Sequence, residues 1–391
     1  MISSNNSFLK LILIISLFVF FLYPFKISFN LDIKNSLDHT YVNYSFLLFV
    51  LYKIIIDKKI NVSDNYINFA LIFFTCIFLY SSAEDIINNQ HDIFLKRIVR
   101  YCIFMSLFLC TLCSIGNKEI NYLKYGLVIL AIIFSFQKML IIIDVYDISK
   151  TINWKHYIGT QRTGFIYVTA FWIIYLDFNK LFNHKNNNKY IVIKNIILAI
   201  VIFGAFTTYS RSTFLGFLST YIIYISLKNI FSFKLIILLV TFFLFFYVSL
   251  QLVFFDFNPL VALHELFNLE KNTSFGYRLF VWKKIILSTY ENIITGSGFF
   301  GVSQIMTVGS GSAHSQYFDI LYRVGVVGFI LYFITIIRML KFYLKNDLSL
   351  FLGLFSMLVI GFFHETIKLP HGTVIAAFLL GYAVNKKKYN K

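Results

Sequence analysis

The chain has 391 residues, of which 58% are hydrophobic and only 14% are charged. A water-soluble domain usually carries about one quarter charged residues, so this composition excludes an aqueous fold and requires lipid as solvent. The apolar runs are long and continuous, without the period-two alternation of a membrane β-barrel. The sequence therefore predicts an all-α, polytopic integral membrane protein, because helices satisfy every backbone group inside a bilayer.

The formal net charge of +17 does not indicate nucleic-acid binding. The basic residues form short clusters between apolar runs, as membrane topology requires, rather than a stripe on a polar domain. Cys110 and Cys113 have the spacing of a redox or metal pair. No neighbouring His or charged residue supports that interpretation. We therefore predict no nucleic-acid partner, no metal and no cofactor.

A helix that crosses the hydrocarbon needs about 20 apolar residues. Applied in chain order, this rule predicts about twelve transmembrane spans. The first run has no small-residue cleavage site after it, so we expect it to be retained as a helix rather than removed as a signal peptide. The predicted spans are 8–25, 41–56, 66–83, 98–115, 122–143, 163–178, 191–209, 212–227, 235–254, 317–338, 347–364 and 370–384.

Lys and Arg in short loops mark the cytoplasmic side of a membrane protein. With the N-terminus in the cytoplasm, each cytoplasmic loop has a basic excess, from Lys58 and Lys59 to the tail at 386–388, while residues such as Asp85 fall outside. The sequence thus predicts a multi-pass protein with both termini cytoplasmic and one membrane domain over 1–391.

A predicted outside loop runs from about 255 to 316, between the ninth and tenth spans. Its length is far beyond an ordinary connection, and loops of this kind are usually functional. Apolar residues recur at helical spacing within it, at Phe275, Leu279, Trp282 and Ile286. We therefore predict an amphipathic helix over 275–290 that lies on the membrane surface.

Charged residues at the edge of a membrane are functional candidates because they are costly there. Arg211 falls in a tight outside turn, and its planar guanidinium suits the oxygens of a phosphate. The alternative is that it simply extends to the interface. Arg278 lies in the amphipathic helix and either binds an anion or belongs to its polar face. His314, just before the tenth span, either takes a proton from a hydroxyl or caps the chain locally.

Further candidates lie nearby in the sequence. Asp319 and Arg323 enter the tenth span, where they either pair with each other or Asp319 orients His314. Arg162, at the outer end of the sixth span, is either a substrate contact or a topology anchor. Glu365, at the outer end of the eleventh span, is an acid or base or an interfacial carboxylate.

The glycines of 296–301 match GxGxxG by letter, but no strand–turn–helix unit of a dinucleotide fold surrounds them. We expect Gly296 and Gly298 to form a turn that lets the backbone approach a helix or a substrate closely. Lys138, inside the fifth span, has no assigned role.

These residues, in this order, resemble the O-antigen ligase and O-antigen polymerase superfamily. The resemblance covers about 150–340 and the overall plan of spans, and its motifs are specific only in combination. Ser315 departs from the pattern, where Asn is commoner. The features that carry it are Arg162 with Gly164, the turn Ser210–Arg211–Ser212, Arg278 to Trp282 followed by Gly296 and Gly298, and His314–Ser315–Gln316 followed by Gly325 and Gly328.

The resemblance implies a metal-independent glycosyltransferase of the bacterial inner membrane that acts on the periplasmic side. Its donor would be an undecaprenyl-pyrophosphate-linked glycan. A ligase passes the glycan to lipid A-core, and a polymerase passes it to a second lipid-linked glycan. By this resemblance Arg211 and Arg278 would contact the pyrophosphate, and His314 would act on the acceptor.

Two alternatives stay open. The position of His314 just ahead of the tenth span favours a ligase slightly over a polymerase. A lipid-linked sugar transporter is a different class, but transporters place charges near the bilayer midplane. Here most of the notable charges gather at the outer face, with Lys138 and Asp319 as exceptions.

Overall fold

The computed structural model describes residues 65–88, 90–112, 115–148, 164–181, 188–208, 210–228, 274–299, 301–302, 305, 312–366 and 370–389. All regular secondary structure in these ranges is helical. The helices are α3 (Asn65–Ile87), α4 (His91–Leu109) with the short η1 (Cys110–Leu112), α5 (Asn117–Ile148), α7 (Gly164–Leu181), α8 (Asn188–Phe206), α9 (Arg211–Leu227), α12 (Ser274–Glu291), α13 (Gln316–Asn346), α14 (Leu348–Gly361) and α15 (Pro370–Tyr389).

The helices follow the apolar runs. Each predicted span between 66 and 227, and each between 317 and 384, falls on one of them. The spans 8–25, 41–56 and 235–254 lie outside the described residues, so the total of about twelve stays a prediction. Among the described residues, four helical segments are long and apolar enough to cross a membrane, namely Asn65–Ile87, Asn117–Phe136, Lys189–Phe206 and Gln316–Asn346.

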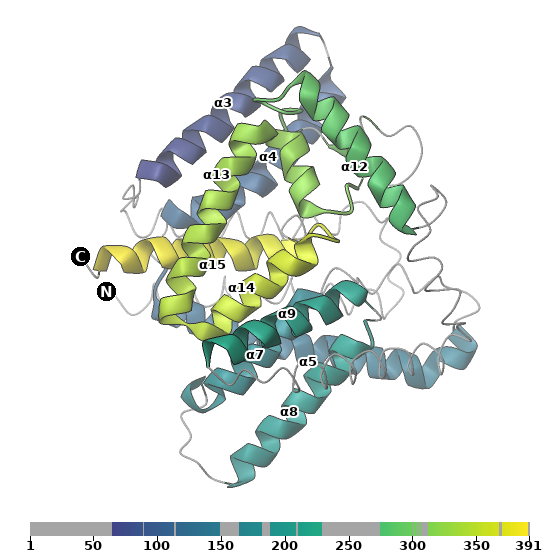
Figure 1. Ribbon diagram of the computed structural model, residues 1–391, viewed down its shortest axis with the longest axis vertical. Coiled ribbons are helices and arrows are strands. Elements are labelled where there is room, and N and C mark those ends of the chain that lie inside the picture. The colour runs from purple at the N-terminus through teal and green to yellow at the C-terminus, as the bar shows by residue number, and fades with distance from the viewer. Residues whose placement is uncertain are drawn as a thin grey trace, which may run out of the picture.

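Helix α7 is largely enclosed by its neighbours in the bundle. It packs against α5, α8, α9 and α14, and Phe165, Ile166 and Tyr167 at its start are fully buried. Figure 1 shows α5, α7 and α8 at one end of the molecule and α3, α4 and α12 at the other, with α13, α14 and α15 between them. Helix α15 packs on α4, and α12 packs on α13, so the two groups form one continuous body.

Helix α13 is broken at Gly325, whose φ of 66° lies in the left-handed region. A turn over 292–299, directly after α12, fills the break. The amide of Ser297 donates to the carbonyl of Tyr322 at 2.7 Å, and the amide of Val326 donates to the carbonyl of Ile293 at 2.8 Å. These bonds satisfy backbone groups that the break would leave unpaired, and they fix the first part of α13 against the end of α12.

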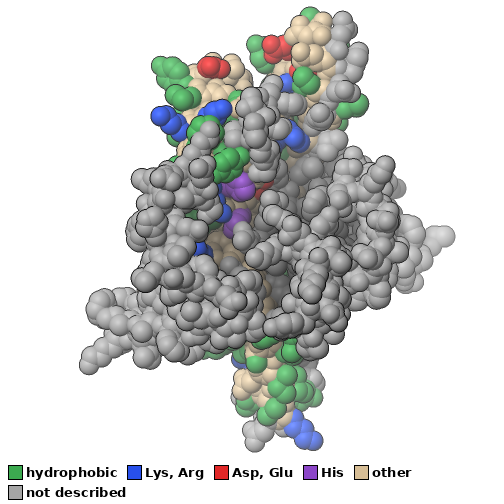
Figure 2. Space-filling model, turned by 90° about the vertical axis from the view of Figure 1, so that its right-hand side faces the viewer, with side chains coloured by type: hydrophobic (Ala, Val, Ile, Leu, Met, Phe, Trp, Pro, Cys, Tyr) green, Lys and Arg blue, Asp and Glu red, His purple; other side chains and the backbone are tan. Residues whose placement is uncertain are grey.

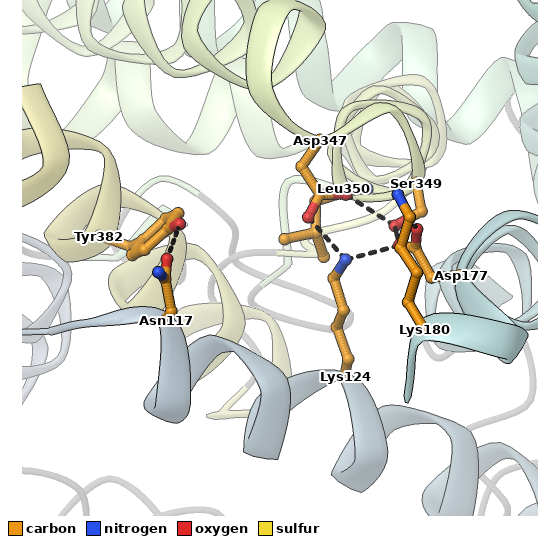
Figure 3. Close-up of polar contacts among 8 residues, drawn as sticks. All are labelled: Asn117, Lys124, Asp177, Lys180, Asp347, Ser349, Leu350 and Tyr382. Carbon is orange, nitrogen blue, oxygen red and sulfur yellow. Dashed lines mark hydrogen bonds and ion pairs between the residues drawn. The ribbon is translucent and has the colours of Figure 1, made fainter. Parts of the chain in front are cut away.

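A buried ion cluster ties α5, α7 and α14 together (Figure 3). The ammonium of Lys124 donates to one carboxylate oxygen of Asp177 and one of Asp347, both at 2.6 Å. The hydroxyl of Ser349 lies within hydrogen-bond distance of both carboxylates and donates its one proton to either of them. Asp347 also caps α14 by accepting from the amide of Leu350. Lys124, predicted only as a cytoplasmic marker, is 5% exposed and joins three helices.

We expect Lys124→Met to destabilise the bundle strongly, because it leaves two carboxylates without their shared cation. Breaking a buried pair in this way costs about 3–5 kcal/mol. Thermal unfolding of the purified protein in detergent measures the change. The matched control is Lys180→Met, since Lys180 is largely exposed and lies 3.7 Å from Asp177. Equal melting temperatures for the two variants would contradict a structural role for the cluster.

Candidate functional site

Helix α12 occupies the place where the amphipathic helix was predicted, and it holds the segment that leads into α13. The indole N–H of Trp282 donates to the carbonyl of Ala313 at 3.0 Å. The ring of Trp282 stacks on Phe318, with centroids 4.8 Å apart. Val281, Ala313 and Tyr322 belong to one small buried cluster. Helix α12 and the start of α13 therefore form a single packed unit.

His314 lies immediately ahead of α13, as the sequence predicted. Its φ of 51° is in the left-handed region, which residues other than glycine seldom adopt. Its amide donates to the hydroxyl of Ser312 at 3.2 Å, and its half-buried ring meets the ring of Tyr277 edge to face at 6.1 Å. The imidazole is thus placed beside α12 by a turn with an uncommon backbone conformation.

Arg211 is the first residue of α9 and is exposed. The hydroxyl of Ser210 caps the helix by accepting from the amide of Thr213. The tight turn predicted between two spans is therefore the junction of α8 and α9. Because the first turn of a helix carries partial positive charge, an arginine there adds to a site that favours an anion.

Arg278 follows Tyr277 on α12 and is half-buried. Burial, and then the nearby charge of Arg211, lower the pKa of the Arg278 guanidinium. Among the described residues, no hydrogen bond or ion pair to Arg278 offsets these costs. Two cations from different helices therefore lie close together, and the field around them favours a negatively charged ligand.

Figure 2 shows the face of the molecule that lies on the right-hand side of Figure 1. On this face, histidine side chains lie beside basic side chains, and an acidic side chain lies next to them. The acidic residue that contacts the His314 segment is Glu365, which is 5% exposed. Its carboxylate accepts from the hydroxyl of Ser312 at 3.0 Å and from the amide of Ala313 at 2.8 Å. The sequence had left the role of Glu365 open, because nothing in the sequence paired it with residues some fifty positions earlier.

Asp319 and Arg323 pair with each other. The guanidinium donates to both carboxylate oxygens, at 2.6 and 2.9 Å, and both side chains are buried. Arg323 also donates to the carbonyl of Phe299 at 3.1 Å. Of the two arrangements that the sequence left open, the structure has the mutual pair. Substrate binding by these two residues stays a prediction.

A second arginine holds the same glycine turn. Arg97 on α4 donates to the carbonyls of Ser297 and Gly298, both at 2.6 Å, and pairs with Asp85 on α3. Sequence reasoning missed Arg97, although an Arg and an Asp at the facing ends of two successive spans could have indicated an ion pair. Together Arg97 and Arg323 hold three consecutive carbonyls of the turn.

The two predicted turn glycines fit this arrangement. A Cβ on Gly298 would lie 1.7 Å from the hydroxyl of Ser81 and 2.7 Å from the guanidinium of Arg97. A Cβ on Gly296 would lie 2.5 Å from the backbone of Gly325. The close approach predicted for these glycines is therefore to α3, α4 and α13. Direct contact between these glycines and a substrate stays a prediction.

Two predicted residues lie outside what the structure describes. Arg162 falls in the undescribed segment before α7, and the side chain of Lys138 is not described. Gly164 packs so closely on Thr213 that a Cβ would lie 1.8 Å from the threonine hydroxyl. The start of α7 is thus beside the start of α9. Within the described residues, no group of three or more His, Cys, Asp and Glu side chains is placed to hold a metal ion.

Comparison with known families adds to this geometry. Residues 196–333 match the family model described as O-antigen ligase. This match supports the resemblance to the O-antigen ligase and O-antigen polymerase superfamily. The resemblance predicted from the sequence is therefore confirmed, and the O-antigen ligase segment includes Arg211, Arg278 and His314. A comparison with curated proteins gave no match.

We expect Gly296→Ala to destabilise the O-antigen ligase segment, because the residue has φ 61° and its new Cβ would meet backbone atoms that cannot move aside. The left-handed conformation and the overpacking together cost about 2–4 kcal/mol. Thermal unfolding measures the effect. The control is Gly116→Ala, whose Cβ would meet only the end of the Glu119 side chain, at 3.3 Å. An unchanged melting temperature for Gly296→Ala would contradict this account of the turn.

Proposed function

We propose that the protein is a membrane glycosyltransferase that moves an undecaprenyl-pyrophosphate-linked glycan onto a sugar hydroxyl in the periplasm. It acts without a metal ion or cofactor, as a multi-pass protein of the bacterial inner membrane with both termini cytoplasmic. One observation carries this proposal. Arg278 is on α12, the helix that also holds the segment of His314, and it lies near enough to Arg211 for the two charges to interact. The match to an O-antigen ligase family supports ligase- or polymerase-type activity in general.

The two arginines suit the leaving group. When the bond between the sugar's anomeric carbon and the phosphate oxygen breaks, negative charge grows on the lipid pyrophosphate. Arg278 and Arg211, together with the N-terminus of α9, stabilise that charge more strongly as it develops. Among the described residues, Arg278 has no acidic partner that neutralises its charge. Arg162 is a further candidate contact.

His314 suits the acceptor. Its imidazole takes the proton of the attacking sugar hydroxyl as the new carbon–oxygen bond forms. The proton remains on the imidazole, and the pyrophosphate leaves with its electron pair. The neighbouring ring of Tyr277 and the fixed turn hold the imidazole beside α12, the helix that carries Arg278. No metal is required for either step, since both charges are handled by side chains.

We favour a ligase, with lipid A-core as the acceptor. The position of His314 directly before α13 supports this choice. The alternative acceptor is a second lipid-linked glycan, which would make the protein an O-antigen polymerase. The predicted outside loop 255–316, which contains α12, helps to select between acceptors. Membrane lipids surround the apolar helices in either case.

The lipopolysaccharide gel profile of a strain lacking this protein distinguishes these functions. If the protein is a ligase, the strain that lacks it contains lipid A-core without glycan, and long lipid-linked polymer accumulates. A core that carries a single repeat unit would instead identify a polymerase. An unchanged profile would contradict both and favour a transporter or a different surface glycan.

We expect Arg278→Ala to abolish glycan transfer while the protein still inserts into the membrane. Arg278→Lys keeps a point charge but loses the planar fork, so we expect transfer to fall by about 10- to 100-fold. Complementation of the deletion strain, with membrane levels measured in parallel, tests both variants. Lys283→Ala is the control, because Lys283 is an exposed cation on the same helix. Full activity of Arg278→Lys would rule out bidentate phosphate binding.

A further inference from the structure

The backbone on the N-terminal side of His314 is held from two directions. The amide of Ala313 donates to the carboxylate of Glu365 at 2.8 Å, and its carbonyl accepts from the indole of Trp282 at 3.0 Å. Ala313 itself is fully buried. Both hydrogen-bonding groups of this residue are therefore used, and the peptide that leads into His314 cannot rotate without losing one of them.

Ser312 extends the same connection to His314. Its hydroxyl donates to Glu365 at 3.0 Å and accepts from the amide of His314 at 3.2 Å. One carboxylate oxygen of Glu365 is thus connected to the backbone amide of His314 through the hydroxyl of Ser312. This matters because His314 has a φ of 51°, a conformation that costs an ordinary residue free energy and persists only where its surroundings hold it.

Glu365 is itself well fixed. It lies in the short turn after α14, and the next residue, Thr366, donates to the side chain of Gln316 at 2.7 Å. The charges of Arg100 and Arg323 lie close enough to interact with that of Glu365. Hydrogen bonds and nearby cations offset the cost of burying the carboxylate. The turn after α14 and the start of α13 therefore form one rigid support.

We propose that Glu365 is a positioning residue that fixes the turn 312–314 and so aims the imidazole of His314 at the acceptor hydroxyl. This inference rests on the proposed function, in which His314 is the base. Glu365 does not touch the substrate in this proposal. It acts by accepting two hydrogen bonds, and Trp282 supports the same turn from the other side.

The arrangement makes a specific kinetic prediction. Glu365→Ala removes both acceptors and frees the turn, and a misplacement of about 1 Å at a catalytic group can lower the rate by about 100-fold. We expect kcat to fall by that factor while the KM for the donor changes less than about twofold, because the arginines that bind the donor are untouched. Glu365→Gln keeps an oxygen that accepts both bonds, so its kcat should stay within about tenfold of the wild type.

The test uses the full chain in proteoliposomes, with a lipid-linked glycan donor and a lipid A-core acceptor. Trp282→Phe is the second variant, since it removes only the indole donor and keeps the stacking on Phe318. We expect it to lower kcat by about 3- to 10-fold, the effect of one hydrogen bond. If Glu365→Ala does not insert into the membrane, Trp282→Phe alone tests whether the turn 312–314 positions His314. Glu84→Ala is the control, because Glu84 is exposed at the end of α3.

The outcomes separate the two proposals. Loss of kcat at constant donor KM in Glu365→Ala and Trp282→Phe, with rescue in Glu365→Gln, supports positioning. If His314→Ala is inactive while these variants keep their kcat or change only KM, positioning is wrong and the proposed function stands. If Glu365→Gln is as poor as Glu365→Ala, the charge of Glu365 matters rather than its hydrogen bonds, and the inference is overturned. Wild-type kcat in His314→Ala would remove the proposed base and this inference with it.

Discussion

Charges buried in a protein that sits in lipid must find partners, and this requirement organises the polar residues of the structure. Unpaired, such charges cost several kcal/mol or more. Lys124 is shared by two aspartates, Arg97 is paired with Asp85, and Arg323 is paired with Asp319. Against this background, the half-buried Arg278 stands apart, because no described residue forms an ion pair with it. The natural partner of such a cation is a ligand.

The paired charges also determine where the catalytic candidates lie. Arg97 and Arg323 donate hydrogen bonds to the carbonyls of the glycine turn after α12. This turn fills the break in α13. Both α12 and the first part of α13 are fixed by this arrangement. Because Arg278 lies on α12 and His314 lies directly before α13, the relative position of cation and imidazole depends on buried ion pairs that never contact them.

The sequence predicted the helices well because hydropathy depends on local composition, and a run long enough to cross a bilayer must be helical. It misplaced two boundaries by seven or more residues: α4 begins at His91 rather than near 98, and α13 ends at Asn346 rather than near 338. The segment that begins α4 contains Lys96 and Arg97, which an apolar rule rejects, while in the structure Arg97 is satisfied by Asp85. Boundaries set by a tertiary ion pair are not visible in a local window.

The same reason explains what could be predicted of the site. Arg211, Arg278 and His314 are conspicuous as ionisable residues at the edges of apolar runs. Arg97 was missed and the role of Glu365 was left open, because their contacts are with residues about 200 and 52 positions away. Their contacts follow from how the helices pack, and a single sequence does not encode that in any short motif. The candidate residues of the site were thus easier to single out than the residues that hold them in place.

The account depends on chemical transfer rather than transport, and one measurement addresses this directly. The purified protein in proteoliposomes is supplied with a lipid-linked glycan donor, an acceptor and a chelator of divalent metals, and released lipid pyrophosphate is quantified beside the glycosylated acceptor. We predict one molecule of lipid pyrophosphate for each glycan transferred, with the chelator present. Movement of intact donor between leaflets without release of pyrophosphate would contradict the account.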